Sequence, residues 1–581
     1  MRNQAVVDTK NGADYRAAGT RRYQSWLMVC LVLTSILPMW FSLGDHPFFG
    51  RSDGRYAAVS RGMADGGSLL VPHLMGEPHL TKPPLTYWLQ AGAMHLLGDN
   101  EFAARLPSAI ASSLTLLMLG WVGMRIGGAR VGVSAMATLA MMPLFIVISR
   151  TTTTDALLSF FWFATLVSGF IAVRSRSAWA VIALWGAVAL GLLTKGPVAW
   201  IPVVLLIIWL SLGRCWDDLR RLRPGYGLIL SALPLLAWAA AVWWHYPEAA
   251  SRWYRETIGR MGGAGVKHAQ PIWYFIPVFI AGLFPATAMM SLPGINLPWR
   301  TIRQRLRQAS DDSLWAIAVV VPFVVFSIIS GKLATYILPL CAPLALLNAL
   351  MLERWLNGGT DKDQPAHKLP EVVNTLFVCS VLIAAALTGI MVYYRIEVMY
   401  RVVPLAMLLT IAAFGLKWVW KRRPQLRGPA MAAFFVCYTA MICGALELED
   451  SLLAPSSNRQ MVEFIHEELG HDKVQLVMFG IGDQSLAFYS DDVVDAESPE
   501  HLLDMANNPP TDFLVVADPD DWARLQPDYE ELFNAFEVWR EWDRHWLGKP
   551  WWLMRLREPV ADQDRLASMA SHTPVTAPAT P

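Results

Sequence analysis

Long apolar segments separated by short polar loops recur along most of the chain. An α-helix needs about 17–25 mainly apolar residues to cross the hydrocarbon core of a membrane. About thirteen such segments can be marked, at residues 26–43, 107–124, 131–149, 156–173, 178–194, 197–213, 226–244, 272–291, 314–330, 335–352, 373–393, 403–418 and 429–446. The pattern predicts a polytopic α-helical membrane protein with about 13 transmembrane helices.

Two stretches near the N-terminus need separate interpretation. Basic residues precede the first segment, 26–43, but no small-residue cleavage site follows it. We therefore expect a retained first span rather than a cleaved signal peptide. Residues 84–97 (PLTYWLQAGAMHLL) are too short to cross a membrane comfortably and are typical of a helix at the membrane interface.

Composition agrees with this class. The 581 residues are 54% hydrophobic and only 16% charged, which is less charge than soluble proteins carry. The net charge of +1 gives no indication of a nucleic-acid partner. The six cysteines lie almost all inside apolar segments and form no CxxC pair. They are typical of small core side chains rather than of disulfides or a metal site.

Lysine and arginine in the short loops orient the spans, because cytoplasmic loops carry an excess of both. With residues 1–25 in the cytoplasm, every second loop should be basic. This holds for residues 125–130, 174–177, 214–223, 299–307 and 417–427. The outer side then receives two long loops, 44–106 and 245–271, which belong to a membrane domain spanning residues 26–446.

An odd number of spans also places residues 447–581 on the outer side. Strand-like runs at 473–481 and 512–518 alternate there with helical stretches such as 461–469. This pattern predicts a small soluble α/β domain. Its tail, ending in HTPVTAPATP, has the composition of a disordered segment.

Two carboxylates lie near membrane boundaries on the outer side. Asp53 opens a helix in the first long loop, and Asp155 follows RTTTT at the mouth of the fourth span. Asp155 admits a second interpretation, as a cap of that helix, because aspartate is a favoured N-cap residue. The charges around Asp53 are equally compatible with a solvated interfacial helix.

Cations lie on the same side. Several residues flank spans or loops on the outer side: Lys82, Lys332 and the pair Lys267 and His268. Tyr336 follows Lys332 closely in the sequence. A single lysine at a span end usually extends its amine toward water. Three lysines on the face that carries both carboxylates instead favour an anion site, such as one for a phosphate at the membrane surface.

The familiar motifs of soluble enzymes are not found in the sequence. It contains no G-x-x-x-x-G-K-[ST], HExxH or GxSxG pattern, and no clustered set of cysteine and histidine ligands. This agrees with a reaction on lipid-borne substrates outside the cytoplasm, where nucleotides are absent.

Several motifs resemble one family in the same order. Residues 53–56 (DGRY) are followed by PHLMGEPHLTKPPLTYWL, GDNEFAARLPSAI, TTTTDALLSFF, LLTKGPVAW, HAQPIWYFIPVFIAGLFP and SGKLATYILPLCAPLALL. They resemble the lipid A aminoarabinose transferases and related bacterial members of the protein mannosyltransferase superfamily (glycosyltransferase family 39 type). The likeness covers residues 23–350. It implies a GT-C fold in a bacterial inner membrane, with a periplasmic active site, and the outer C-terminal domain is compatible with it.

The resemblance also implies roles for individual residues. Asp53 falls on the family's first-loop catalytic carboxylate, and Asp155 on its second carboxylate. Lys82 falls on the lysine that contacts the donor phosphate, and Tyr336 on a tyrosine of the donor cavity. His268 falls near a histidine implicated in metal binding. Arg55, Tyr56 and Lys332 are further candidates for binding donor or substrate.

Two positions depart from the family pattern. Gly54 stands where relatives commonly have glutamate after the aspartate, and Thr81 stands where they often have glutamate before the lysine. The second glutamate is associated with a metal in the aminoarabinose transferases. We therefore predict no metal ligands here, although a divalent metal as cofactor stays open. The change also weakens aminoarabinose as the sugar.

The resulting expectation is a glycosyltransferase. It would move aminoarabinose or a related sugar from polyprenyl (undecaprenyl) phosphate to lipid A or another envelope acceptor. Asp53 removes the proton if the acceptor is a hydroxyl. A phosphate acceptor, with a second pKa of about 6, needs little help of this kind. The alternative is a transporter or flippase for lipid-linked sugars, although such proteins often show repeats and midplane charges that this sequence lacks.

Overall fold

The structure is a computed structural model of the whole chain. It describes residues 28–48, 51–257, 269–290, 299–356, 373–382, 385, 389, 399–423, 426–453, 457–469, 474–496, 498–509, 512–525, 528–544 and 549–557. Two compact units can be distinguished. The first comprises residues 1–46, 59–73 and 78–450, and the second comprises residues 47–58, 74–77 and 451–581.

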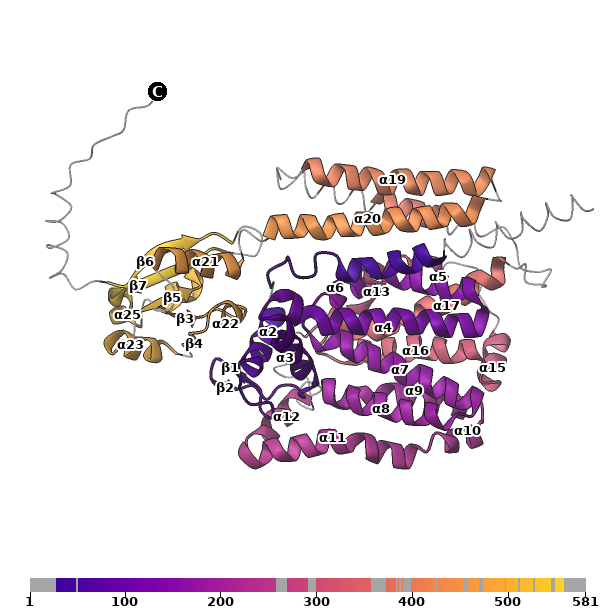
Figure 1. Ribbon diagram of the computed structural model, residues 1–581, viewed down its shortest axis with the longest axis horizontal. Coiled ribbons are helices and arrows are strands. Elements are labelled where there is room, and N and C mark those ends of the chain that lie inside the picture. The colour runs from indigo at the N-terminus through magenta and orange to yellow at the C-terminus, as the bar shows by residue number, and fades with distance from the viewer. Residues whose placement is uncertain are drawn as a thin grey trace, which may run out of the picture. The chain divides into compact units, whose positions relative to one another are not determined.

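The first unit is helical (Figure 1). Its longer helices are α4 (Glu101–Gly127), α7 (Thr154–Ser175), α8 (Ala178–Lys195), α9 (Ile201–Leu212), α11 (Pro224–His245), α16 (Asp311–Ile328), α17 (Cys341–Leu356), α19 (Met399–Arg422) and α20 (Arg427–Leu453). Shorter elements are α3 (Leu85–Leu97), α5 (Ala129–Ala140), α6 (Pro143–Ser149), α10 (Trp216–Arg221), α12 (Ala249–Thr257), α13 (Phe275–Gly282), α14 (Ala286–Met289), α15 (Trp299–Arg307), and the 3-10 segments η1 (Gly196–Trp200) and η3 (Ala334–Leu340).

Helix α4 shows how local sequence sets these elements. The side chain of Asn100 caps its first turn by accepting a hydrogen bond from the backbone N–H of Ala103 at 2.9 Å. The helix ends at Gly128, whose φ of 86° suits glycine. A Cβ atom on Gly123 would lie 2.9 Å from the Cα of Gly132. Small residues therefore let α4 and α5 approach closely, as is common between membrane helices.

By length and composition, eight helices of the described residues are able to cross a membrane, or nine if a bent pair forms one span. Two shorter apolar helices, Met28–Trp40 and Val373–Leu382, are also present. Several apolar helices are thus found as predicted. The number thirteen is not reached by these criteria.

Two predicted spans are interrupted by proline. The segment 131–149 is bent by 73° between α5 and α6, where Pro143 begins the second helix. The segment 272–291 is not one helix but two short ones, α13 and α14, and Pro285 stands before the second. Proline lacks the N–H that continues a helix, so apolar composition alone predicted continuity wrongly at both places. Residues 84–97 do form a helix, α3.

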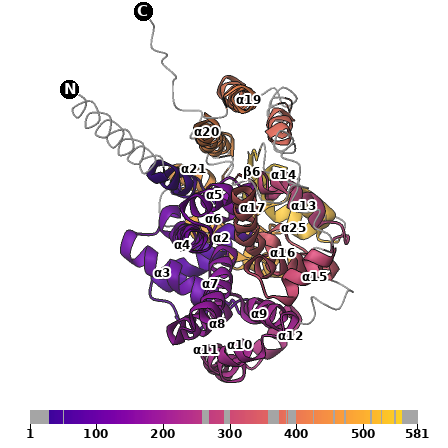
Figure 2. The same cartoon turned by 90° about the vertical axis from the view of Figure 1, so that its right-hand side faces the viewer.

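Helices α8 and α9 run in opposite directions beside α7. Lys195, the last residue of α8, bonds to Asp155 in the first turn of α7. Trp209 of α9 lies at the other end of α7, where its ring centroid is 5.3 Å from the Cζ of Arg174. The chain therefore turns back within η1. Figure 2 shows α7, α8 and α9 nearly end-on as neighbours.

The second unit contains a five-stranded sheet with the order β4-β3-β5-β7-β6. Its strands are β3 (Gln475–Phe479), β4 (Val493–Asp495), β5 (Phe513–Ala517), β6 (Phe536–Trp542) and β7 (Trp551–Leu556). Strand β3 is parallel to β4 and β5, whereas β7 is antiparallel to β5 and β6. The predicted strands at 473–481 and 512–518 are confirmed as β3 and β5.

Helices cover both faces of this sheet. They are α21 (Asn458–Leu469), α22 (Leu486–Tyr489), α23 (Pro499–Asn507), α24 (Pro519–Leu525) and α25 (Glu530–Ala535). Along β3, Leu476 and Met478 belong to one apolar cluster, and Val477 and Phe479 belong to another. Successive side chains of a strand point to opposite faces, so two cores form. This unit also takes in residues 47–58 of the first long loop.

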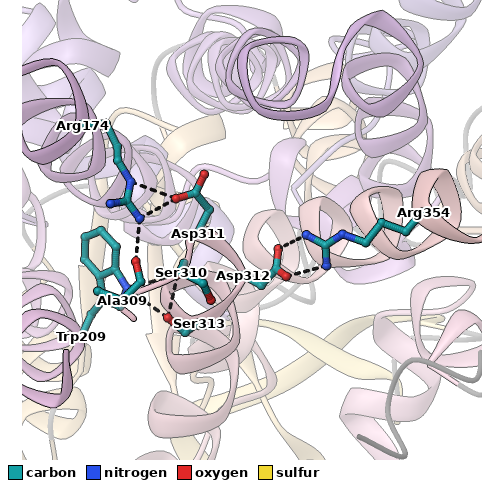
Figure 3. A network of polar contacts seen from close by, with 8 residues as sticks. All are labelled: Arg174, Trp209, Ala309, Ser310, Asp311, Asp312, Ser313 and Arg354. Atoms are coloured by element: carbon teal, nitrogen blue, oxygen red, sulfur yellow. Dashed lines mark hydrogen bonds and ion pairs between the residues drawn. The ribbon is translucent and has the colours of Figure 1, made fainter. Parts of the chain in front are cut away.

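A polar network joins four helices at one end of the first unit (Figure 3). Arg174, at the end of α7, donates from Nη2 to Asp311 Oδ1 at 2.6 Å and to the carbonyl oxygen of Ala309, also at 2.6 Å. Asp312 accepts from Arg354 of α17 at 2.6 Å and from Arg305 of α15 at 3.1 Å. Asp311 and Asp312 open α16, so their charges also suit the positive end of that helix dipole.

We predict that Asp312→Ala lowers the free energy of unfolding by about 1–2 kcal/mol, because charge-assisted bonds from two arginines are lost while both guanidinium groups keep contact with water. The measurement is denaturant or thermal unfolding of the full chain in detergent. Asp217→Ala is the matched control, because its bond to Arg220 joins two largely exposed side chains. Equal stability of both variants would contradict this role of Asp312.

Candidate active site

The first candidate segment is helix α2 (Arg51–Ala64), which carries Asp53, Arg55 and Tyr56. Asp53 lies in its first turn, where a negative charge is stabilised by the helix dipole. Asp53 and Arg55 are half-buried. The guanidinium carbon of Arg55 is 5.8 Å from the ring centroid of Tyr56. Among the described residues, no hydrogen-bond partner is found for its buried Nε.

The second candidate is a group of three residues from three elements of the first unit. Asp155 in the first turn of α7 accepts a bond from Lys195 Nζ of α8 at 2.6 Å. The same Nζ lies 5.4 Å from the ring centroid of Tyr336 in η3, within the range of a cation–π interaction. The exposed fractions of the Asp155 and Lys195 side chains are 12% and 18%. The predicted residues Asp155 and Tyr336 are therefore brought together, with Lys195 between them.

This geometry excludes the interpretation of Asp155 as a helix cap. The N-cap of α7 is Thr153, and Asp155 lies two residues further into the helix. A carboxylate this far from water is costly unless it is paired. Lys195 supplies that pairing, so the local charges neutralise each other.

Lys195 was not among the predicted site residues. Its motif, LLTKGPVAW, contributes to the family resemblance. The usable signal was a lysine that ends an apolar helix immediately before Gly196 and Pro197. Gly196, with a φ of 74°, ends the helix there, so the cation stays at the end of the bundle.

Lys332 has a structural contact in this region. It is only 3% exposed, and its Nζ donates to the carbonyl oxygen of Gln270 at 2.8 Å. Gln270 N in turn donates to the carbonyl oxygen of Ser330 at 3.1 Å, and Ala269 pairs with Gly331. Lys332 thus fastens the end of the second long loop to the chain after α16. Its predicted role toward a phosphate stays a prediction.

Lys82 and Thr81 precede α3. Lys82 Nζ donates to the carbonyl oxygen of Thr81 at 3.1 Å, and Thr81 Oγ1 is 2.8 Å from His79 Nε2. His268 lies outside the described residues.

The residues at Thr81 do not fit Ca²⁺ or Mg²⁺. A hydroxyl beside an imidazole lacks the carboxylate oxygen that these ions prefer. In the described part of the chain, no group of three or more histidine, cysteine, aspartate or glutamate residues is arranged to hold a metal ion.

A buried amide connects α2 to the loop before Asp155. Ser60 Oγ of α2 donates to Gln90 Oε1 at 2.8 Å, and Gln90 Nε2 donates to the carbonyl oxygen of Thr152 at 2.6 Å. All three residues are fully buried. Buried polar groups that are bonded on both sides fix the relative position of their elements. The C-terminal half of α2 is thereby tied to the start of α7.

The chain is similar to known transferases of lipid-linked sugars. Residues 81–244 match the family model described as dolichyl-phosphate-mannose-protein mannosyltransferase. An undecaprenyl phosphate-α-4-amino-4-deoxy-L-arabinose arabinosyl transferase from Aeromonas hydrophila subsp. hydrophila is 33% identical over 372 residues, which are 60% of this chain and 65% of that protein. The protein of the same name from Edwardsiella ictaluri is 32% identical over 362 residues, 60% of this chain and 62% of the relative.

The fold is also found among solved structures. The crystal structure of ArnT from Cupriavidus metallidurans bound to undecaprenyl phosphate matches with a TM-score of 0.74 and 20% identity, over 91% of this chain and 98% of that one. The apo structure of the same protein matches with a TM-score of 0.75 and 20% identity, over 92% of this chain and 98% of that one. The chain spans less than two thirds of the length of the curated relatives named above. The family resemblance is confirmed, and so is the largely helical fold that it implies.

We predict that Asp155 and Lys195 are energetically coupled. Because the pair is mostly buried, Asp155→Asn and Lys195→Gln should each lower the free energy of unfolding by about 1–3 kcal/mol, between the values typical of surface and fully buried pairs. The double variant should lose less than the sum of the two. A double-mutant cycle on the full chain in detergent measures this coupling.

The matched control is the more exposed pair Asp218 and Arg221, at 2.7 Å. Its coupling should be below about 0.5 kcal/mol. If the Asp155–Lys195 cycle gives the same small value as this control, the pair does not hold α7 and α8 together.

Proposed function

We propose that this chain is itself a membrane glycosyltransferase. It resembles undecaprenyl phosphate-α-4-amino-4-deoxy-L-arabinose arabinosyl transferases over 60% of its length. It also has the fold of ArnT. It takes a sugar from undecaprenyl phosphate and transfers it to lipid A or another envelope acceptor. The sugar is 4-amino-4-deoxy-L-arabinose or a related one, because Gly54 and Thr81 depart from the pattern of the aminoarabinose transferases.

One observation carries this proposal. A carboxylate, an ammonium group and an aromatic ring lie close together at the end of apolar helices. They belong to Asp155, Lys195 and Tyr336. A phosphate on a membrane lipid needs a cation at such a boundary, where the low dielectric strengthens the contact. Two of the three residues, Asp155 and Lys195, lie within the segment that matches the mannosyltransferase family model.

The reaction breaks the bond between the anomeric carbon of the sugar and a phosphate oxygen. The electron pair leaves with the phosphate, and the acceptor oxygen forms the new bond to the anomeric carbon. Lys82, Lys195 and Arg55 stabilise the charge on the departing phosphate. A hydroxyl acceptor gives its proton to Asp53, whereas an ionised phosphate acceptor leaves Asp53 the task of positioning groups.

We further propose about thirteen crossings of the inner membrane, with residues 1–25 cytoplasmic and residues 447–581 periplasmic. Helices α8 and α9 run antiparallel, which supports two membrane crossings by this segment, whereas its length and composition alone suggest one. The segments 174–177 and 299–307 are both basic. Arg174 of the first pairs with Asp311, and Arg305 of the second pairs with Asp312, so both segments lie at one end of the bundle. This agrees with a common cytoplasmic side, and it leaves Asp155 at the opposite end of α7.

We predict that Asp53→Asn and Lys195→Gln each lower the rate of sugar transfer by about 100-fold. The first variant removes a general base or positioning group, and the second removes charge stabilisation of the phosphate. The assay uses the purified full chain in detergent, undecaprenyl phosphate-linked 4-amino-4-deoxy-L-arabinose and lipid A, with product measured by mass spectrometry. Asp217→Asn, which changes an exposed side chain of α10, is the control and should retain wild-type transfer.

Detergent solution has no separate compartments, so turnover there distinguishes an enzyme from a transporter. Full transfer by Asp53→Asn would overturn the role given to Asp53. Absence of transfer by the wild-type chain with this donor and with other lipid-linked sugars would overturn the proposed function itself.

A further inference from the structure

Gly54 is a buried glycine inside helix α2, directly after Asp53. Glycine weakens a helix relative to alanine, so its use at this position needs a reason. A Cβ atom on Gly54 would lie 2.1 Å from the Cβ of Ser485 and 2.4 Å from its Cα. No side chain fits into that space. The backbone of α2 therefore rests against the turn that carries Ser485, within the second unit.

Ser485 is itself held rigidly. It is fully buried, and its Oγ accepts a bond from Asn458 Nδ2 at 2.6 Å and donates to Asp483 Oδ1 at 2.9 Å. Asp483 Oδ2 is 3.4 Å from Arg544 Nη2, and the Arg544 guanidinium lies 3.7 Å from the ring centroid of Trp551.

Burial lowers the pKa of the Arg544 guanidinium, and the neighbouring carboxylate of Asp483 opposes that shift. The turn is thus connected to helix α21 through Asn458 and to strand β7 through Trp551. A turn held by bonded, buried side chains from two other elements has little freedom to shift.

A second contact holds the chain just before α2. The backbone N–H of Phe48 donates to Tyr489 Oη at 2.8 Å. The Phe48 ring is 2% exposed and meets the Phe488 ring edge-on, with centroids 4.8 Å apart. Phe488 and Tyr489 belong to α22, which begins immediately after Ser485. Asp53 therefore lies between two anchor points on one short stretch of the second unit.

We propose that the C-terminal α/β unit positions Asp53 for the transfer reaction, with Ser485 and Tyr489 as positioning residues and Gly54 as the residue that permits the close contact. This inference rests on the proposed function. It also accounts for the absence of glutamate after Asp53, because any side chain at position 54 requires the space that Ser485 occupies. The C-terminal unit is then part of the catalytic apparatus, not an appended module.

The test compares two alanine substitutions in the same helix. Gly54→Ala introduces the Cβ that meets Ser485, whereas Gly62→Ala places a Cβ with no atom within 4 Å. Both changes raise helix propensity, so a difference between them reports the contact alone. Hydrogen exchange of residues 47–58 and steady-state transfer kinetics are measured on the purified full chain.

We expect Gly54→Ala to speed exchange of these amides at least tenfold and to lower kcat by about 10- to 100-fold, because a displacement near 1 Å has effects of this size. The KM for the lipid-linked donor should change less than threefold. Gly62→Ala should match the wild type in both measurements. Unchanged exchange in Gly54→Ala, or a loss of kcat without faster exchange, would overturn the proposal.

A milder variant covers the case in which Gly54→Ala does not fold. Tyr489→Phe removes only the hydroxyl that accepts the Phe48 N–H, so exchange of that amide should rise and kcat should fall by a smaller factor. Tyr529→Phe, which loses a hydroxyl bonded to Glu500 elsewhere in the unit, is its control. Equal behaviour of these two variants would overturn the proposal. If the wild-type chain transfers no sugar, the proposed function fails, while the exchange data still decide whether α2 is held at Ser485.

Discussion

The ion pair between Asp155 and Lys195 is the interaction on which the arrangement of the candidate site depends. It forms where α7 begins and α8 ends, so it fixes the turn through which the chain passes into η1 and back along α9. The pair is mostly buried, and each charge is tolerated there because the other is present. The cation also lies over the ring of Tyr336, which brings a third element, η3, to the same place.

The opposite end of α7 is held by an ion pair with α16, which is itself paired with α17. Arg174, Asp311, Asp312 and Arg354 join the ends of α7, α16 and α17, and their side chains retain contact with water. The bundle therefore has polar groups at both ends and apolar packing between them. The two ends differ in exposure: the side chain of Lys195, whose amine lies over the Tyr336 ring, is 18% exposed, whereas that of Arg174, which lies over the Trp209 ring, is 41% exposed.

Much of the fold could be predicted from the sequence, and some of it could not for identifiable reasons. Hydrophobic length found the helices, and alternation found β3 and β5, because both depend on local pattern. The breaks at Pro143 and Pro285 were missed since apolar composition concealed them. Asp155 and Tyr336 were both candidates from the sequence, and the structure places both beside Lys195. Lys195 was not a candidate, because its pairing links helices through a turn that no local motif encodes. The close contact of Gly54 with Ser485, more than 400 residues apart, was likewise beyond local inspection.

The most direct test of the account is mass spectrometry of lipid A and surface glycans from cells that carry the intact gene, no gene, or the gene with Asp53→Asn. The account predicts that one sugar addition, of pentosamine size if the sugar is aminoarabinose, disappears from an envelope glycan in both altered strains. An identical set of glycans in all three strains, under conditions in which the protein is made, would contradict it.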